Sequence, residues 1–226
     1  MESVDFSVIL ASTVHDTKNS LSLLLQSLDE LISDASGVTP EQMRRFAVIH
    51  YEASRVNNDL IQMLAMYKLN QAQLPLNLNY HPLRDFLEDQ MLRYATLLET
   101  RGIGYDIVCD DELAWVFDAD LVAGILNNVI TNTIRYTRDH LSVTASCSNG
   151  LLVLEIADNG AGYPEKMLEQ QGNYLKSVNF STGSTGLGLH FAAQIARLHV
   201  KGERSGDIEL ANGGRLGGGI FRLSLP

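Results

Sequence analysis

The spacing of hydrophobic positions in residues 1–73 is that of two amphipathic α-helices joined by a short connection. Ser36-Gly37 ends the first predicted helix, and Thr39 and Pro40 begin the second as its N-cap and its first helical residue. Gln42 stands where a capping box requires an amide or carboxyl side chain. We therefore predict an antiparallel helical hairpin. The apolar stripes of its two helices are Phe6, Leu10, Val14, Leu21, Leu24, Leu28 and Leu31, and Met43, Phe46, Ile49, Ala53, Val56, Leu60, Leu64 and Tyr67.

The two apolar stripes of this hairpin would face water if nothing covered them. A second copy of the hairpin is the natural cover, which predicts a homodimer with a four-helix bundle. Leu74-Pro75-Leu76 then interrupts the helical pattern, because proline cannot continue a helix. This break predicts two domains, the helical hairpin over 1–74 and a second domain over 75–226.

Beyond residue 75 the hydrophobic pattern mixes helical and strand spacing. Asn149-Gly150 stands between two alternating runs and favours a type I′ turn, which predicts a β-hairpin. The fold class that we predict is α+β: the helical hairpin is followed by an α/β sandwich in which helices cover one face of a single sheet. The predicted helices cover 82–101, 120–136 and 187–199, and the predicted strands cover 105–109, 141–147, 151–157, 208–211 and 220–225.

Composition and charge exclude several classes of protein. A hydrophobic content of 45% with 19% charged residues is ordinary for a soluble globular protein. The net charge of −10, without any cluster of Lys and Arg, argues against a nucleic-acid partner. Apolar runs are far shorter than the roughly 20 residues that cross a bilayer, and the N-terminus lacks a basic signal region, so we expect a cytoplasmic protein. Cys109 and Cys147 have no metal-ligand spacing and are predicted to be reduced thiols.

One face of the predicted helix over 120–136 carries Asn128, Asn132, Arg135 and Tyr136. A merely solvated face favours Lys and Glu, whereas Asn is a poor helix former. An Asn carbonyl oxygen suits Mg²⁺ that is already bound to a triphosphate, and an Arg side chain pairs with phosphate. This face is therefore a candidate nucleotide site.

Two glycine segments follow the predicted strand over 151–157 and bracket a loop. In the first, Asp158–Gly162, a carboxylate able to accept a hydrogen bond from the adenine amino group precedes glycines that permit close backbone approach. An ordinary tight turn explains this pentapeptide equally well. The second, Gly183–Leu189, opens a helix whose free N–H groups favour phosphate, but it is neither a P-loop nor a Rossmann fingerprint. As a pair, the segments suit a nucleotide held under a mobile lid.

His15 lies away from the apolar stripe of its predicted helix and should be exposed. Asp16 is its neighbour, and Asn19 stands one turn later. A lone exposed histidine is usually without function, but a carboxylate that accepts from one ring nitrogen fixes the tautomer and raises the nucleophilicity of the other. The pattern favours phosphorylation of His15. The five other histidines lack such neighbours and are interpreted as structural or incidental: His50, His81, His140, His190 and His199.

These segments resemble the conserved boxes of two-component sensor histidine kinases of the GHKL ATP-binding superfamily. Thr13–Leu21 resembles the H-box, Asn128–Thr137 the N-box, and the two glycine segments the G1 and G2 boxes, in the family's order and over nearly the whole chain. The resemblance implies a second domain of the Bergerat type with ATP and Mg²⁺ as cofactors. It also implies autophosphorylation of a histidine and transfer of the phosphoryl group to an aspartate of a response-regulator receiver domain.

The resemblance also implies residue roles. His15 is the implied phosphoacceptor, Asp16 its general base, and Asn19 the residue that orients a water to dephosphorylate the regulator. Asn132 is the implied ligand of the Mg²⁺ ion that binds together with the nucleotide, and Asn128 is implied to assist it. The other implied nucleotide-binding residues are Arg135 at phosphate, Tyr136 and Asp158 at adenine, and Gly160, Gly162, Thr185, Gly186, Leu187, Gly188 and Leu189.

Two features depart from the family pattern. Ser20 stands where the family very often has a proline that bends the first helix. The H-box begins within the first twenty residues, so we expect either an excised fragment or a signal supplied by a separate sensor protein.

Two alternative functions remain. A GHKL ATPase would need a glutamate at the position of Asn128, since an amide cannot act as general base. A non-catalytic phosphotransfer or scaffold protein fits poorly with intact glycine boxes and both asparagines.

Overall fold

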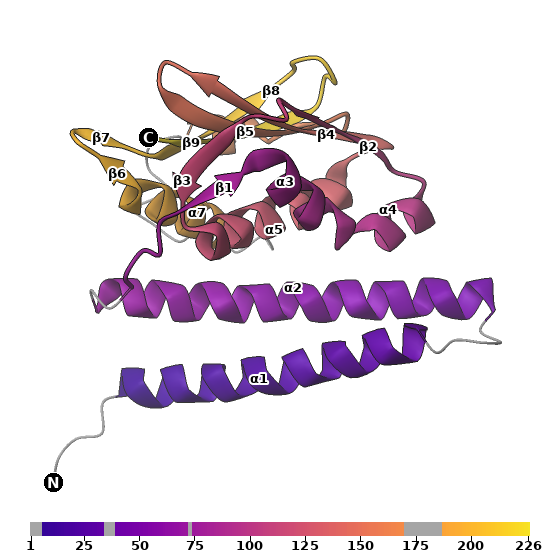
Figure 1. Cartoon of the computed structure of the whole chain (residues 1–226). Coiled ribbons are helices and arrows are strands. Elements are labelled where there is room, and N and C mark those ends of the chain that lie inside the picture. Colours follow the sequence, from indigo (N-terminus) through magenta and orange to yellow (C-terminus); the bar gives the residue numbers. More distant parts are fainter. Residues whose placement is uncertain (1–5, 34–38, 72–73, 170–186) are drawn as a thin grey trace, which may run out of the picture. The chain divides into compact units, whose positions relative to one another are not determined.

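The computed structural model describes residues 6–33, 39–71, 74–169 and 187–226. The chain divides into two compact units, which we call the hairpin unit (Met1–Pro75) and the sheet unit (Leu76–Pro226) (Figure 1). Each is described by itself. Among the described residues, no helix is both long and apolar enough to span a membrane.

The hairpin unit consists of α1 (Phe6–Ser33) and α2 (Pro40–Asn70), which pack against each other. The start of α2 is fixed by a capping box, as the sequence predicts. The Gln42 backbone N–H donates to the Thr39 hydroxyl at 3.3 Å, and the Thr39 N–H donates to Gln42 Oε1 at 2.9 Å. These two bonds satisfy backbone donors that a helix start would otherwise leave unpaired.

A five-stranded sheet in the order β2-β4-β5-β9-β8 forms the centre of the sheet unit. Only the β2–β4 pair is parallel. Asn149 and Gly150 connect β4 and β5 with φ angles of 53° and 74°, which is the conformation that a type I′ turn requires. The predicted hairpin is therefore confirmed. The strands are β2 (Gly104–Cys109), β4 (His140–Ser148), β5 (Leu151–Asp158), β8 (Asp207–Asn212) and β9 (Gly219–Leu225).

Helices of the sheet unit cover one face of this sheet (Figure 1). They are α3 (Leu83–Leu92), α4 (Ala95–Arg101), α5 (Ala119–Tyr136) and α7 (Leu187–Leu198). The strand residues that alternate toward them are buried and apolar. The apolar side of α5 is also buried, as the helical spacing of Val122, Leu126, Val129, Ile130 and Ile134 predicts. The opposite sheet face is polar, with Arg222 Nε 2.7 Å from Glu155 Oε2. The predicted α/β sandwich is confirmed.

The region 79–117 differs from the sequence prediction. Instead of one helix over 82–101, strand β1 (Asn79–Pro82) leads into α3, and a break at Tyr94 separates α3 from α4. β1 pairs antiparallel with β3 (Ala114–Phe117), which was not predicted. Four-residue strands give no periodic signal of their own, and their pairing is a long-range contact. The short elements α6 (Glu165–Glu169), β6 (Val200–Lys201) and β7 (Arg204–Ser205) were missed for the same reason.

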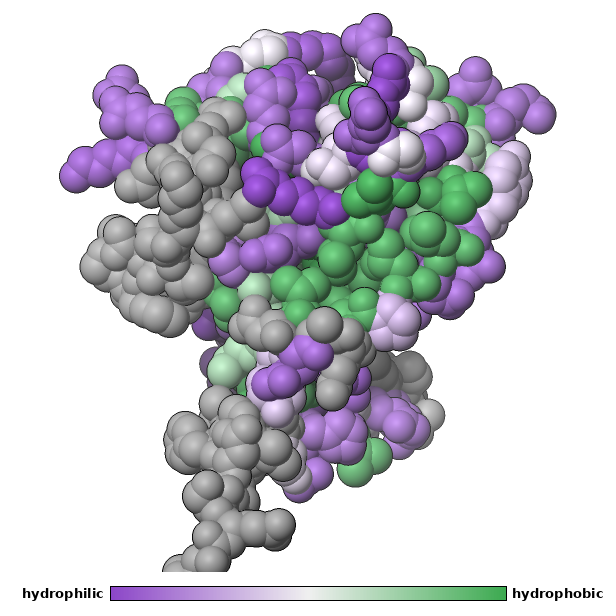
Figure 2. All heavy atoms as spheres, turned by 90° about the vertical axis from the view of Figure 1, so that its left-hand side faces the viewer, coloured by the Kyte–Doolittle hydropathy of each residue, from purple (hydrophilic) through white to green (hydrophobic). Residues whose placement is uncertain are grey.

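The two-stranded sheet also exposes apolar side chains. Tyr80 of β1 lies opposite Val116 of β3, and both are exposed. Figure 2 shows a region of hydrophobic surface bordered by hydrophilic residues on the side turned toward the viewer. Exposed apolar side chains are common on soluble domains, so Tyr80 and Val116 carry no functional assignment.

Candidate functional site

Helix α5 is the element that carries most of the predicted site, and buried polar contacts fix where it begins. Asp118 caps the helix: its Oδ1 accepts from the Leu121 N–H at 3.0 Å, and its Oδ2 accepts from the Asn77 N–H at 2.8 Å. The Asp118 N–H donates to Nε2 of His199 at 3.1 Å, and His199 Nδ1 donates to the Ile195 carbonyl at 2.9 Å. These bonds tie the start of α5 to the end of α7.

Asn128 and Asn132 contact each other on the polar face of α5, as their spacing predicts. The Asn132 Nδ2 group donates to Asn128 Oδ1 at 3.0 Å. Asn128 is partly buried and Asn132 is exposed, so the pair lies at the edge of the helix's buried side. Arg135 and Tyr136 are exposed one turn later, with the guanidinium carbon 5.5 Å from the centre of the tyrosine ring. Because Asn132 uses its nitrogen in this pair, its amide oxygen is the atom suited to a hard cation.

The first turn of α7 lies directly against Asn128. A Cβ atom on Gly188 would overlap the Asn128 amide, so only glycine allows this approach. The first N–H groups of an α-helix have no partner within it, and the helix dipole makes that end attractive to anions. Leu187 and Leu189 flank Gly188 in this turn. Thr185 and Gly186, also predicted to bind nucleotide, lie outside the described residues.

Asp158 ends β5 and is only 8% exposed. Its Oδ1 accepts from the N–H groups of Gly160, at 2.6 Å, and Gly219, at 3.3 Å. A Cβ atom on Gly160 would overlap the carbonyl of Tyr136, so glycine is needed where the turn meets the C-terminal end of α5. Both carboxylate–N–H bonds use Oδ1, and Oδ2 is therefore the oxygen suited to accept from a ligand.

Two asparagines and a third glycine segment, residues 213–219, support this site and were not among the predicted residues. Asn159 Oδ1 accepts from the N–H groups of Arg138, Asp139 and His140, each at 3.2 Å. Asn212 Oδ1 accepts from the Tyr163 N–H at 2.7 Å, and Asn212 Nδ2 donates to the Tyr163 carbonyl at 2.8 Å.

These two asparagines fix the chain on both sides of the turn that contains Gly162, whose φ angle is +80°. The glycine-rich run 213–219 was visible in the sequence as a turn signal, but local pattern does not place it beside Asp158.

His15 belongs to the hairpin unit. Its side chain is 59% exposed, as predicted, with Nδ1 3.4 Å from Asp16 Oδ1. The same nitrogen lies 3.3 Å from Asn19 Nδ2. Because both neighbours approach Nδ1, Nε2 is the ring nitrogen that neither of them engages.

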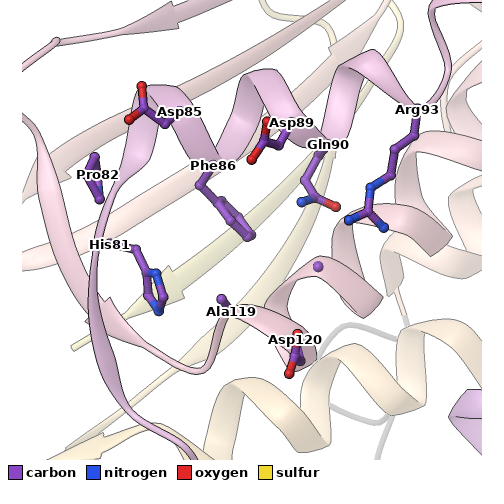
Figure 3. A pocket seen from close by; sticks show the side chains of 10 residues that line it. His81, Pro82, Asp85, Phe86, Asp89, Gln90, Arg93, Ala119 and Asp120 are labelled. Carbon is purple, nitrogen blue, oxygen red and sulfur yellow. The ribbon is translucent and has the colours of Figure 1, made fainter.

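A cavity of about 300 Å³ lies in another part of the sheet unit, between α3 and the first turn of α5 (Figure 3). Figure 3 shows Asp85 and Asp120 at opposite ends of this cavity, so their carboxylates do not converge. Asp120 is about 80° from Asn128 around α5, and none of the predicted nucleotide residues line the cavity. Among the described residues, no group of three or more His, Cys, Asp or Glu side chains is arranged to hold a metal.

Comparison with known proteins agrees with this geometry. Residues 117–226 match the model of the family described as histidine kinase-, DNA gyrase B-, and HSP90-like ATPase. This match covers α5, the Asp158 turn and α7, which are the elements that carry the candidate nucleotide site.

The similarity extends over both units of the chain. Sensor protein SrrB of Staphylococcus aureus (strain MRSA252) is 25% identical over 225 residues, which cover 96% of this chain and 37% of SrrB. The chain thus spans little more than a third of the length of this curated relative. The part that it matches corresponds to the GHKL core of a sensor histidine kinase.

Solved structures establish the fold. The Acinetobacter baumannii histidine kinase AdeS matches with a TM-score of 0.60 at 19% identity, over 92% of this chain and 95% of that chain. Full-length ShkA in complex with AMPPNP matches with a TM-score of 0.64 at 20% identity, over 96% of this chain and 45% of that chain. The catalytic domain of histidine kinase ThkA matches with a TM-score of 0.56 at 20% identity, over 66% and 97%.

Proposed function

We propose that this chain is an ATP-dependent protein histidine kinase of a two-component system, which phosphorylates His15 and passes the phosphoryl group to an aspartate of a response regulator. The observation that carries the proposal is the convergence of three features at the C-terminal half of α5. These are the Asn128–Asn132 pair, the first turn of α7 against Asn128, and the Asp158 turn against the end of α5. All lie within the segment that matches the ATPase family.

In this proposal each group binds a different part of the nucleotide. Oδ2 of Asp158 accepts a hydrogen bond from the adenine amino group, and Tyr136 borders the base. The amide oxygen of Asn132, with Asn128 beside it, ligates the magnesium ion. Arg135 and the first N–H groups of α7 neutralise phosphate oxygens. A magnesium ion held there by Asn132 and Asn128 would offset the negative charge that develops on the phosphate groups during transfer.

The contacts of His15 support a nucleophilic role for Nε2. When Nδ1 carries the proton and donates a hydrogen bond to Asp16, the lone pair of the neutral ring is on Nε2. That lone pair attacks the γ-phosphorus: a nitrogen–phosphorus bond forms, the bond to the bridging oxygen breaks, and ADP leaves with the electron pair. When Asn19 instead donates to Nδ1, the proton must be on Nε2, and the ring cannot attack. Asp16 and Asn19 therefore favour opposite tautomers.

We further propose that the hairpin unit dimerises. Leu24, Ile49 and Val56 belong to the predicted apolar stripes and are 51%, 51% and 44% exposed in the single chain. A second hairpin that covers them completes a four-helix bundle. Light scattering on the purified chain tests this proposal: a dimeric mass supports it, and a monomeric mass at micromolar concentration argues against it. The receiver domain of a response regulator is the proposed acceptor, and a separate sensor protein is a proposed source of the signal.

Incubation with γ-labelled ATP and Mg²⁺ tests the kinase proposal. We expect acid-labile label on the wild-type protein, no label on His15→Gln, and retained label on the matched control His50→Gln, which changes a histidine on α2. Release of free phosphate without labelled protein would instead indicate the GHKL ATPase alternative. Absence of nucleotide binding would indicate the non-catalytic phosphotransfer or scaffold alternative.

A further inference from the structure

A cluster of polar side chains on the edge strand β2 has no role in the proposed chemistry. Asp106 accepts hydrogen bonds from two segments that are distant in the sequence, β4 and the turn between β8 and β9. The donors are His140 Nε2 at 2.7 Å, Ser142 Oγ at 2.7 Å and Arg215 Nη2 at 3.0 Å.

Arg215 connects the cluster to the glycine turn between β8 and β9. The N–H of Gly213 donates to the Gly218 carbonyl at 2.8 Å and closes this turn. The turn then contacts Asp158 twice: Gly218 N–H donates to its carbonyl at 3.0 Å, and Gly219 N–H to its Oδ1 at 3.3 Å. A Cβ on Gly218 would lie 2.5 Å from the Asp158 carbonyl oxygen and 2.5 Å from its Oδ1, so the turn packs closely against this carboxylate.

His140 connects the cluster to the other side of Asp158. The His140 backbone N–H donates to Asn159 Oδ1 at 3.2 Å, and its carbonyl accepts from the Asn159 N–H at 3.2 Å. Asn159 follows Asp158 in the chain. Through Arg215 and His140, the Asp106 carboxylate is therefore joined to the two segments that position Asp158 and its neighbour.

The charge of Asp106 suits this linking role. Partial burial acts to raise the pKa of its carboxyl, but the hydrogen bonds from Ser142, His140 and Arg215 outweigh that effect and hold the pKa below its usual value. Asp106 is thus ionised at neutral pH, and an ionised acceptor strengthens each of these bonds.

We propose that Asp106 and Arg215 are positioning residues that hold Asp158 in the geometry that selects adenine over guanine. The proposal rests on the function proposed above, in which Asp158 Oδ2 accepts from the adenine amino group. Guanine carries a carbonyl oxygen at the corresponding ring carbon, so acceptor would face acceptor there. Displacing the Asp158 carboxylate therefore lowers affinity for ATP and leaves affinity for GTP, which gains nothing from that carboxylate, almost unchanged.

Calorimetric titration of the full chain with Mg-ATP and with Mg-GTP tests this proposal. We expect Arg215→Gln and Asp106→Asn each to weaken ATP binding by about fivefold, a size typical of substitutions that act through neighbouring contacts. GTP binding should stay unchanged. The double variant should bind ATP no more weakly than Asp106→Asn alone, because Arg215→Gln removes a bond that Asp106→Asn already weakens. Arg215→Lys should recover part of the ATP affinity, since an ammonium group also donates to Asp106.

Arg222→Gln is the matched control. It removes a guanidinium–carboxylate pair of similar length on the same sheet, but Arg222 pairs with Glu155 and Glu209 rather than with the Asp106 cluster. We expect its ATP-to-GTP preference to equal that of the wild type. Thermal unfolding of every variant separates loss of fold from loss of selectivity.

The outcomes distinguish this inference from the proposed function. If the wild type binds no ATP, the proposed function fails and this inference fails with it. If the wild type prefers ATP but Arg215→Gln keeps the full preference, the positioning role is refuted and the proposed function stands. If Arg215→Gln weakens ATP and GTP equally, or only in parallel with its thermal stability, the residue is merely structural and the inference is also overturned.

Discussion

Replacing Gly188 by alanine tests whether the Asn128 amide has to lie where the structure places it. A Cβ at position 188 would overlap that amide, whereas the Gly188 backbone has no positive φ angle that alanine would strain. The added methyl group therefore fits only if Asn128 rotates. That rotation breaks the 3.0 Å hydrogen bond from Asn132. In the proposed function, this bond orients the amide that ligates the magnesium nucleotide.

The size of the effect follows from the single bond that is lost. A hydrogen bond of this kind contributes about 1 kcal/mol net, and about 1.4 kcal/mol is a tenfold change in affinity. We expect the Kd for Mg-ADP to rise by about five- to tenfold. Stability should not fall in parallel, because alanine is favoured over glycine in a helix by about 1 kcal/mol. Calorimetric titration and urea unfolding of the same preparation measure both quantities.

Gly124→Ala is the matched control on the facing helix. A Cβ there would touch the Phe191 ring at 3.4 Å, which is an acceptable contact at the end of a side chain. It gives the same helix preference but leaves Asn128 in place, so nucleotide affinity should stay at the wild-type value. The reasoning is refuted if Gly188→Ala binds Mg-ADP as tightly as the wild type, or if Gly124→Ala loses as much affinity.

Three further predictions concern stability and accessibility. His199→Ala leaves the buried Asp118 N–H without its acceptor, so urea unfolding should show a loss of about 1–3 kcal/mol, and wild-type stability would contradict this assignment. The pKa of the Asp106 carboxyl is lower in the folded protein than its ordinary value of 3.8, so ionised Asp106 stabilises the fold at pH values above 3.8. This stabilisation is lost as the pH falls through the lower pKa of the folded state. Calorimetric scans from pH 6 to about pH 3 should therefore show the stability difference between wild type and Asp106→Asn shrinking, and a constant difference would count against it. Burial raises the pKa of the Cys109 thiol while Cys147 is exposed, so a thiol reagent should label one cysteine in the folded protein and a second only in urea, and Cys147→Ser should abolish the first reaction.

Features whose causes lie within a few residues were predictable from the sequence. The capping box at Thr39, the turn at Asn149-Gly150 and the apolar side of α5 each depend on neighbours in the chain. The contact between Asn128 and Asn132 also follows from helical spacing alone.

Features that depend on distant segments were not predictable in this way. The β1–β3 pair joins residues more than thirty positions apart, and its strands are too short to show a pattern. The contact of Gly219 with Asp158 spans 61 positions. Asn212 and Arg215 act on the site only because the β8–β9 turn returns to it, and their residue types alone are those of any exposed turn.

The position of that turn can nevertheless be traced to the hydrophobic pattern. Ile156 of β5 pairs with Phe221 of β9, and both are buried on the helix-covered side of the sheet. A slip of one residue in this pairing would turn the apolar set of β9 toward the polar face, so burial fixes the register strongly. With the register fixed, the N–H of Gly219 falls beside the Asp158 carboxylate. The spacing of core residues in two distant strands thus determines where the proposed adenine-binding group lies, and the Asp106–Arg215 pair has only to restrain a turn that the sheet has already brought there.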